Sequence, residues 1–177
     1  MPFMLRKLAS RKYIDLLFSI ENALDIKAEF ILDEVKPNKN ELSLWLAHTQ
    51  ADFNDTVLAI LGTLRTIETM WFIIIDVELI KKYGFNCKHT PNKNIPFIER
   101  RDTHYDLSDL TVRSMNDVAK LYKDIAMRHS ESGSDIFIVQ YQQKQLKNLL
   151  KEAIRNRKFD VNLADERLQQ EITELTK

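Results

Sequence analysis

Three side chains suited to binding anions stand close together near the middle of the chain: Arg100, Arg101 and His104. A guanidinium group presents its donors in a planar fork that matches phosphate and carboxylate oxygens. These residues fall in a stretch from Phe85 to Tyr105 that is rich in Pro, Asn and Lys, so we predict one long irregular loop. Irregular connections longer than about 15 residues are uncommon in compact domains, and those that occur are usually functional or disordered. We take all three as candidate binding residues, and Arg101 and His104 also as candidate catalytic groups.

The same loop holds a thiol and two imidazoles, in Cys87, His89 and His104. Zinc is commonly bound by thiolate and imidazole groups, and a catalytic zinc keeps three protein ligands and a water. The chain contains neither a Cys-x-x-Cys nor a His-Glu-x-x-His motif. We therefore predict no metal and no cofactor, and interpret the loop as solvated and polar, with an incidental thiol.

A third histidine, His129, ends the run Lys-Asp-Ile-Ala-Met-Arg-His that starts at Lys123. The simplest interpretation is that Arg128 and His129 complement the negative end of a helix. The run also resembles the HEPN superfamily of helical ribonucleases, which places an arginine four to six residues before a histidine at such a position. Here Lys123 stands where that family has arginine. The resemblance implies a helical fold with His129 as a candidate catalytic residue.

Basic residues recur every three or four positions towards the carboxyl end, which places them on one face of a helix. These residues are Lys144, Lys147, Lys151, Arg155 and Lys158. Such a stripe can contact phosphates or an acidic protein. The alternative is a solvated face that is partly neutralised by acidic residues of the last predicted helix, namely Asp165, Glu166, Glu171 and Glu174.

Composition narrows the fold class. The 177 residues include three glycines and four prolines, far below the usual shares of roughly 7% and 5%. Antiparallel sheets use many tight turns and parallel α/β folds use glycine-rich loops, so glycine scarcity argues against both. Net charge is zero, which gives no general signal for nucleic acid. The single cysteine cannot form an internal disulfide.

Apolar periodicity predicts helices in five segments. The first runs from a cap at Ser10 to about Val35. The second follows a turn at 36–40 and continues to Tyr83-Gly84, with residues 54–56 as either a break or a polar face. The others follow caps at Asp106 or Ser108, at Asp135, and a break near residue 160. Within the second helix, His48, Asp52 and Asp55 are interpreted as surface or cap residues. The β-branched run Trp71–Val77 is compatible with a buried strand, but the helical stripe enters it in phase, which favours helix.

The sequence thus predicts an all-α fold, a single helical domain over residues 1–177, built as an antiparallel bundle of about five helices with one irregular loop at about 85–105. We predict a non-enzymatic interaction protein of regulatory, immunity, antitoxin-like or effector type. Its preferred partner is another protein or a second copy. The alternative is a helical nucleic-acid binder or HEPN-like ribonuclease that uses the loop Arg and His residues and the basic stripe. With no secretory signal or membrane-spanning run, we expect a cytoplasmic protein with no membrane partner.

Overall fold

The computed structural model describes residues 2–19, 26, 28–35, 41–132 and 137–176. It contains a six-stranded sheet with the order β4-β5-β2-β1-β3-β6, in which each neighbouring pair is antiparallel. The strands are β1 (Phe3–Leu8), β2 (Leu42–Ala47), β3 (Met70–Asp76), β4 (Asn86–His89), β5 (His104–Ser108) and β6 (Ile138–Tyr141). The predictions of an all-α fold and of a helical bundle domain are therefore wrong.

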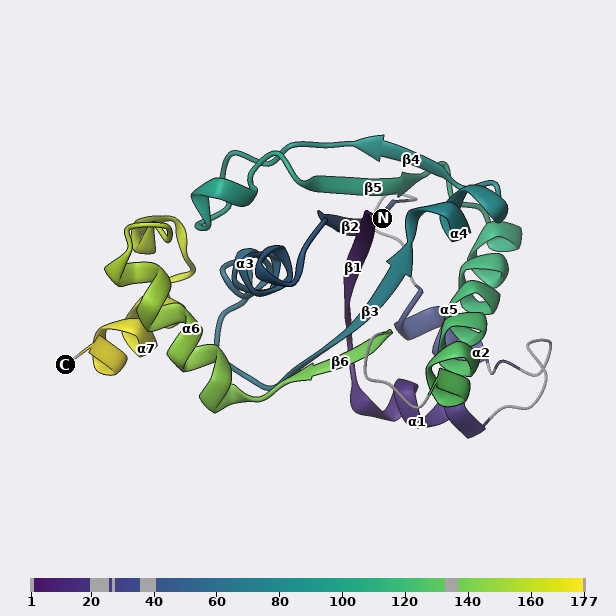
Figure 1. The fold of residues 1–177 in the computed structure, drawn as a ribbon, viewed down its shortest axis with the longest axis horizontal. Coiled ribbons are helices and arrows are strands. Elements are labelled where there is room, and N and C mark those ends of the chain that lie inside the picture. The colour runs from purple at the N-terminus through teal and green to yellow at the C-terminus, as the bar shows by residue number, and fades with distance from the viewer. Residues whose placement is uncertain (1, 20–25, 27, 36–40, 133–136, 177) are drawn as a thin grey trace.

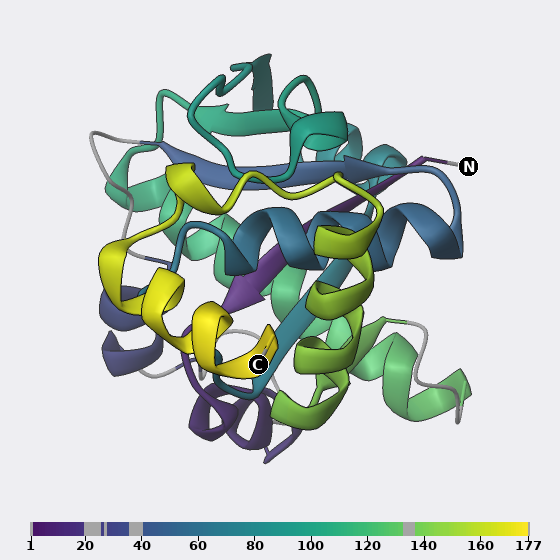
Figure 2. The same ribbon diagram turned by 90° about the vertical axis from the view of Figure 1, so that its left-hand side faces the viewer.

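Helices cover both faces of this sheet (Figure 1). One group, on the face that we call the α5 face, is α1 (Arg11–Ser19), α2 (Ala28–Asp33), α4 (Val77–Lys82) and α5 (Val112–Ser132). The other group, on the face that we call the α3 face, is α3 (Gln50–Leu61), α6 (Gln143–Arg155) and α7 (Glu166–Thr176). Figure 2 shows α6 and α7 lying outside α3. None of the described helices is long and apolar enough to span a bilayer.

The sheet forms without glycine-rich turns because helices join most of its strands. Among the described elements, β1 and β2 are connected through α1 and α2, β2 and β3 through α3, and β5 and β6 through α5. The directly joined pair is β4 and β5, whose connection contains the 3-10 turn Ile98–Arg100. Tight two-residue hairpins are what require glycine, so a low glycine count does not exclude this type of antiparallel sheet.

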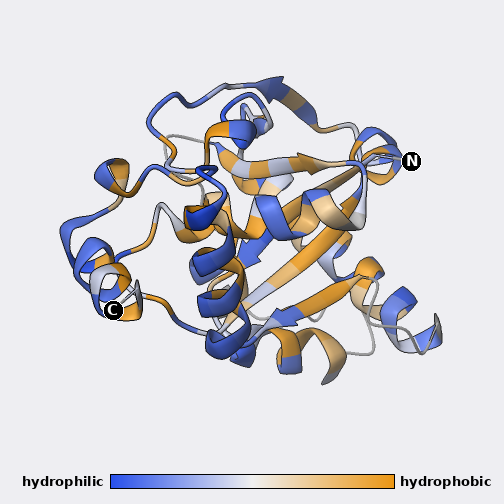
Figure 3. Ribbon diagram, turned by 60° about the vertical axis from the view of Figure 1, so that its left-hand side comes forward, coloured by the Kyte–Doolittle hydropathy of each residue, from blue (hydrophilic) through white to orange (hydrophobic). Residues whose placement is uncertain are grey.

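The run Trp71–Val77, predicted as helix, is mostly strand β3, and Val77 begins α4. Phe72 and Ile74 face the core under α3, while Ile73 and Ile75 face the core under α5. A strand buried on both faces is apolar at nearly every position and loses the alternation by which strands are recognised. Figure 3 shows this continuous hydrophobic character along the central strands.

The other strands correct the remaining helix and loop predictions. Strand β1 precedes the predicted cap at Ser10, and the single helix predicted from there to Val35 is wrong, because α1 ends at Ser19 and α2 begins at Ala28. Strand β2 lies in the second predicted helix and β6 in the fourth. The predicted irregular loop at 85–105 contains β4 in full and the first two residues of β5. Each strand is four to seven residues long, which is too short to establish a period against a helical background.

Several helix signals are confirmed. Ser10 caps α1 through its hydroxyl, which accepts from the backbone N–H of Lys12. Gly84 adopts φ +71° just after α4, the left-handed conformation that favours glycine at a helix end. Helices α5, α6 and α7 lie within the segments where periodicity predicted helix, but the predicted caps of α5 at Asp106 and Ser108 are wrong, because both residues belong to β5 and α5 begins at Val112. The predicted turn at 36–40 and the predicted cap at Asp135 lie outside the described residues.

Glu34 is a carboxylic acid buried in the core on the α5 face, with 2% of its surface exposed. Its Oε2 accepts a hydrogen bond from the backbone N–H of Ala9 at 2.6 Å. Burial raises the pKa of Glu34 from 4.5 to about 7, against the opposing effects of that N–H and of the positive charges on Arg6 and Lys7. Tyr122 also faces this carboxyl, and burial raises the pKa of its hydroxyl to about 12. At neutral pH, Glu34 is therefore poised between its two protonation states.

We expect this group to make stability depend on pH. Between pH 4.5 and about 7 the folded chain holds a proton on Glu34 that the unfolded chain releases, so the free energy of unfolding falls as pH rises through this window. The total loss is about 3 kcal/mol, at about 1.4 kcal/mol per pKa unit. Glu34→Gln should remove this slope and be more stable than wild type at pH 8. Urea unfolding from pH 5 to pH 8 measures the free energy of unfolding of wild type and variant. Glu152→Gln, which makes the same change at an exposed position, is the control. A wild-type slope that persists in Glu34→Gln would contradict the assignment.

Candidate functional site

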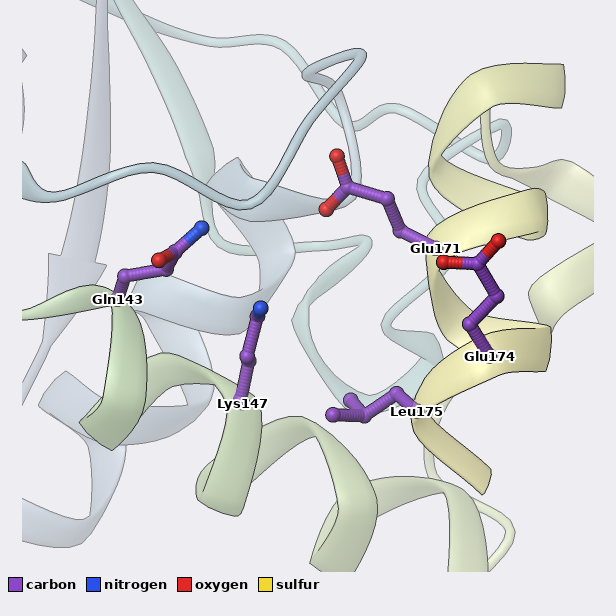
Figure 4. A pocket seen from close by; sticks show the side chains of 5 residues that line it. All are labelled: Gln143, Lys147, Glu171, Glu174 and Leu175. Carbon is purple, nitrogen blue, oxygen red and sulfur yellow. The ribbon is translucent and has the colours of Figure 1, made fainter. Parts of the chain in front are cut away.

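The predicted basic stripe lies beside two cavities between α6 and α7. The first, drawn in Figure 4, has a volume of about 380 Å³ and is lined by Gln143, Lys147, Glu171, Glu174 and Leu175. The second has a volume of about 410 Å³ and is lined by Lys151, Ile154, Arg155, Leu175 and Thr176. Because Leu175 lines both cavities, they are neighbours along one depression. We call these nine residues the α6–α7 groove.

The sequence of α6 separates an apolar face from a basic one. Leu146, Leu150 and Ala153 are buried in the core on the α3 face. The basic residues fall between them at intervals of three or four, so they occupy the outer side of the same helix. Figure 3 shows the hydrophilic outer side of α6. Lys147 and Lys151 are half-buried beside the groove, as is usual for lysines whose aliphatic stem covers apolar surface while the charged head stays in water.

Four of the five stripe residues hold their charge without an acidic partner. In the described part of the chain, no ion pair is formed by Lys144, Lys147, Lys151 or Arg155. Neutralisation by the last helix is therefore incomplete: Glu171 and Glu174 line the first cavity with Lys147 without forming a salt bridge to it. The groove combines a basic wall with an apolar side chain, Leu175.

Lys158 departs from the stripe because α6 ends before it. The helix stops at Arg155, and Arg157 adopts φ +58°, which turns the chain away. The Nζ of Lys158 donates to a carboxylate oxygen of Glu99 at 2.8 Å and lies 3.8 Å from a carboxylate oxygen of Asp55. The hydrogen bond to Glu99 raises the pKa of Lys158. The positive charge of Lys158 is therefore paired with Glu99 and Asp55 of the same chain.

The back of the first cavity is fixed by hydrogen bonds to one backbone unit. The amide of Gln143 donates to the carbonyl of Ile67 at 2.7 Å, and the N–H of Ile67 donates to the carboxylate of Glu171 at 3.0 Å. Ile67 itself is buried. These contacts connect α6 and α7 to the segment before β3 and fix the position of both helices at this end of the groove. Figure 4 shows Gln143 and Glu171 projecting from their helices towards each other.

The candidate catalytic residue His104 lies on β5 within a hydrogen-bonded cluster. Its Nδ1 is 2.9 Å from the hydroxyl and from the carbonyl oxygen of Thr90. The Thr90 hydroxyl also lies 2.6 Å from a carboxylate oxygen of Asp106, and the His104 ring packs edge-on against Trp45. These contacts tie the 90–103 connection to the sheet and account for His104 structurally.

Arg100 and Arg101 are both held by the chain itself. Arg100 is buried, and its guanidinium group forms an ion pair with Asp52 near the start of α3. Arg101 donates from Nε to the carbonyl of Ile95 at 3.0 Å. Although burial alone would raise it, the pKa of Asp52 is lowered to about 2 by the hydrogen bond from Arg100 and by backbone N–H groups. Asp52 also completes a capping box with Thr49, which confirms its interpretation as a cap residue.

The fold does not bring the candidate catalytic residues together. His129 lies on α5 and contacts Phe18 of α1, on the α5 face of the sheet. His104 packs against Trp45, which belongs to the core on the other face. The sheet therefore separates the two imidazoles. The helical bundle that a HEPN-like ribonuclease would need is also replaced by the sheet.

The potential zinc ligands are separated in the same way. Cys87 pairs with Leu107 in the sheet register and faces the α5 side, whereas His104 faces the α3 side. Among the described residues, no group of three or more His, Cys, Asp or Glu side chains is placed to hold a metal ion.

No sequence signal identifies two of the residues that line the groove. Gln143 and Leu175 line it because α6 and α7 are brought together by tertiary contacts such as those that both helices make to Ile67. Periodicity assigns both residues only to helices. The basic stripe was visible because helical spacing is local, while the cavities depend on tertiary packing.

The chain has no match among the protein-family models, the curated proteins or the solved structures with which it was compared.

Proposed function

We propose that this chain is a non-enzymatic binding protein that holds an acidic segment of another protein in the α6–α7 groove. The supporting observation is a row of four cations without acidic partners, Lys144, Lys147, Lys151 and Arg155, beside two cavities. Cations on a fixed helix attract and orient an oppositely charged partner. The cavities give the partner room to bury apolar side chains against Leu175 and Ile154.

The spacing of the cations defines the partner further. Lys147, Lys151 and Arg155 are four residues apart on one helix, which puts successive charges about 6 Å apart along its axis. A partner helix with glutamate at every fourth position has the same repeat. Apolar residues between the glutamates would then enter the cavities on either side of Leu175. We infer an amphipathic acidic helix as the bound segment.

A nucleic acid is the weaker candidate for this groove. The nine described residues that line the groove include no aromatic ring, and such rings are what single-strand binders use for base stacking. Nucleic-acid binding stays a prediction that the same experiment can test.

The test uses a fluorescent helical peptide with glutamates at every fourth position and leucines between them. The triple variant Lys147→Gln, Lys151→Gln, Arg155→Gln should bind it about thirtyfold more weakly than wild type. Three ion pairs at the protein surface at up to about 1 kcal/mol each give roughly 2 kcal/mol in total. Fluorescence anisotropy at low and high salt measures the dissociation constant, which should rise with salt.

A matched triple variant, Lys82→Gln, Lys88→Gln, Lys93→Gln, removes the same charge from exposed positions elsewhere. It should bind the peptide within about twofold of wild type. An equal loss of peptide affinity in both triple variants would show that only net charge matters, and would contradict binding in the α6–α7 groove. Tighter binding of an oligouridine RNA than of the peptide, lost in the first triple variant, would replace the protein partner by a nucleic acid.

A further inference from the structure

An apolar cavity of about 330 Å³ lies far from the α6–α7 groove, where α4 packs beside the sheet. In Figure 1, α4 stands on the opposite side of the molecule from α6 and α7. The cavity is lined by residues of β1, β2, β4, β5 and α4 and their flanks, namely Pro2, Met4, Leu46, His48, Val77, Ile80, Lys81, Phe85, Cys87 and Tyr105.

Strand alternation and helix spacing bring these side chains to one place. Leu46 and Tyr105 belong to the α5 face of their strands, and every second residue of a strand shares a face. On α4, Val77, Ile80 and Lys81 are three and four residues apart and so share one helical face. The floor is buried, since Met4 and Ile80 are 4% and 2% exposed. The cavity is therefore a product of the sheet and α4 together.

The lining has a consistent chemistry. Most of it is hydrocarbon or aromatic, and none of the ten described lining residues is acidic. Two nitrogen-bearing side chains, His48 and Lys81, are exposed at its edge. Binding sites for small molecules are typically apolar with a few polar groups that fix orientation. An apolar body with a negatively charged end matches this distribution of surface and charge.

We propose that this cavity binds a small monocarboxylic acid with an apolar body of about eight to twelve carbon atoms. The size follows from volume, because a dry cavity of about 150 Å³ accommodates benzene, and this one is about twice as large. The hydrocarbon body lies against Met4, Leu46 and Ile80. The carboxylate lies at the edge, where it accepts hydrogen bonds from Lys81 and His48.

Lys81 is available for this role although it already has a partner. Its Nζ lies 2.7 Å from the carboxylate of Glu78, and both side chains are more than 60% exposed. Exposed pairs three residues apart on a helix are weak and exchange readily. The ring of His48 forms no hydrogen bond in the described part of the chain, so one of its nitrogens can donate to the ligand.

The test compares three probes of equal chain length: decanoate, decanol and decyltrimethylammonium, each below its micelle concentration. Calorimetry and NMR shifts of the wild-type protein should report saturable 1:1 binding of decanoate, with nuclear Overhauser contacts to Met4 and Ile80. Decanol should bind about two- to fivefold more weakly, because it lacks the charge, and the cationic probe weaker still. No saturable decanoate binding, or equal binding of the cationic probe, would overturn the proposal.

Variants locate the site. Val77→Phe fills the half-buried edge of the cavity and should abolish decanoate binding. Lys81→Met should weaken binding about two- to fivefold, whereas Lys82→Met, the exposed neighbour outside the cavity, should leave it unchanged. If circular dichroism shows that Val77→Phe is unfolded, the nuclear Overhauser contacts of decanoate in the wild-type protein alone determine where it binds. Contacts to residues outside the cavity, or equal effects of the two lysine variants, would refute the site.

Discussion

Replacing Phe72 with alanine is expected to lower the free energy of unfolding by about 4 kcal/mol, the upper range for truncating a buried aromatic ring. Phe72 lies on β3, is fully buried and packs edge-on against Tyr141 of β6 with ring centroids 5.8 Å apart. The loss combines the transfer of the ring to water with the cavity that remains, because a strand held between two neighbours cannot move in to fill it. Urea unfolding monitored by circular dichroism measures it.

Phe18→Ala is the matched control, since it makes the same chemical change at a position that is 39% exposed. Its loss should be less than about half that of Phe72→Ala, because less apolar area leaves the water on folding. Similar losses in the two variants would contradict the burial of β3 between two helical layers.

Replacing Arg100 with methionine is expected to lower the free energy of unfolding by about 3 kcal/mol. The substitution leaves Asp52 without its cationic partner in a position that is 23% exposed, and breaking a buried pair from one side is strongly destabilising. Because the pKa of Asp52 is lowered from 3.8 to about 2, the pair contributes fully above about pH 4. Its contribution is lost as pH falls towards 2. Acid unfolding of wild type and variant should therefore converge.

Two further variants make this result specific. Arg113→Met removes an exposed arginine and should change stability by less than about 0.5 kcal/mol. Adding Asp52→Asn to Arg100→Met should recover part of the loss, since no charge is then left without a partner. A double variant less stable than Arg100→Met alone would instead assign the main contribution of Asp52 to capping α3.

Sequence alone was sufficient where structure depends on neighbours in the chain. The periodicity of α5, α6 and α7, the cap at Ser10 and the left-handed Gly84 are determined within a few residues. The basic side of α6 was visible for the same reason. Lys158 was assigned to it because the sequence pattern continues, while the helix does not.

Sequence failed where structure depends on distant partners. A central strand such as β3 is apolar on both faces because two helical layers cover it, and that pattern equally suits a buried helix. Glycine scarcity was misleading, because crossover helices replace most hairpins in this sheet. No local signal encodes the burial of Arg100 against Asp52, the separation of His104 from Cys87 by the sheet, or the three cavities, because all of them depend on pairings between distant segments.

The central position of β1 has a consequence for synthesis on the ribosome. This strand pairs with β2 on one side and with β3 on the other, where Phe3 lies opposite Asp76. At about 5–20 residues per second, the nascent chain carries β1 for several seconds before β3 exists. During that time the edge of β1 that later pairs with β3 is open, and an apolar strand with an open edge is prone to aggregation. Arg6 and Lys7 interrupt its apolar residues, and such gatekeeper charges oppose intermolecular pairing. Arg6 and Lys7 therefore oppose aggregation of β1 in the interval before β3 is available to pair with it.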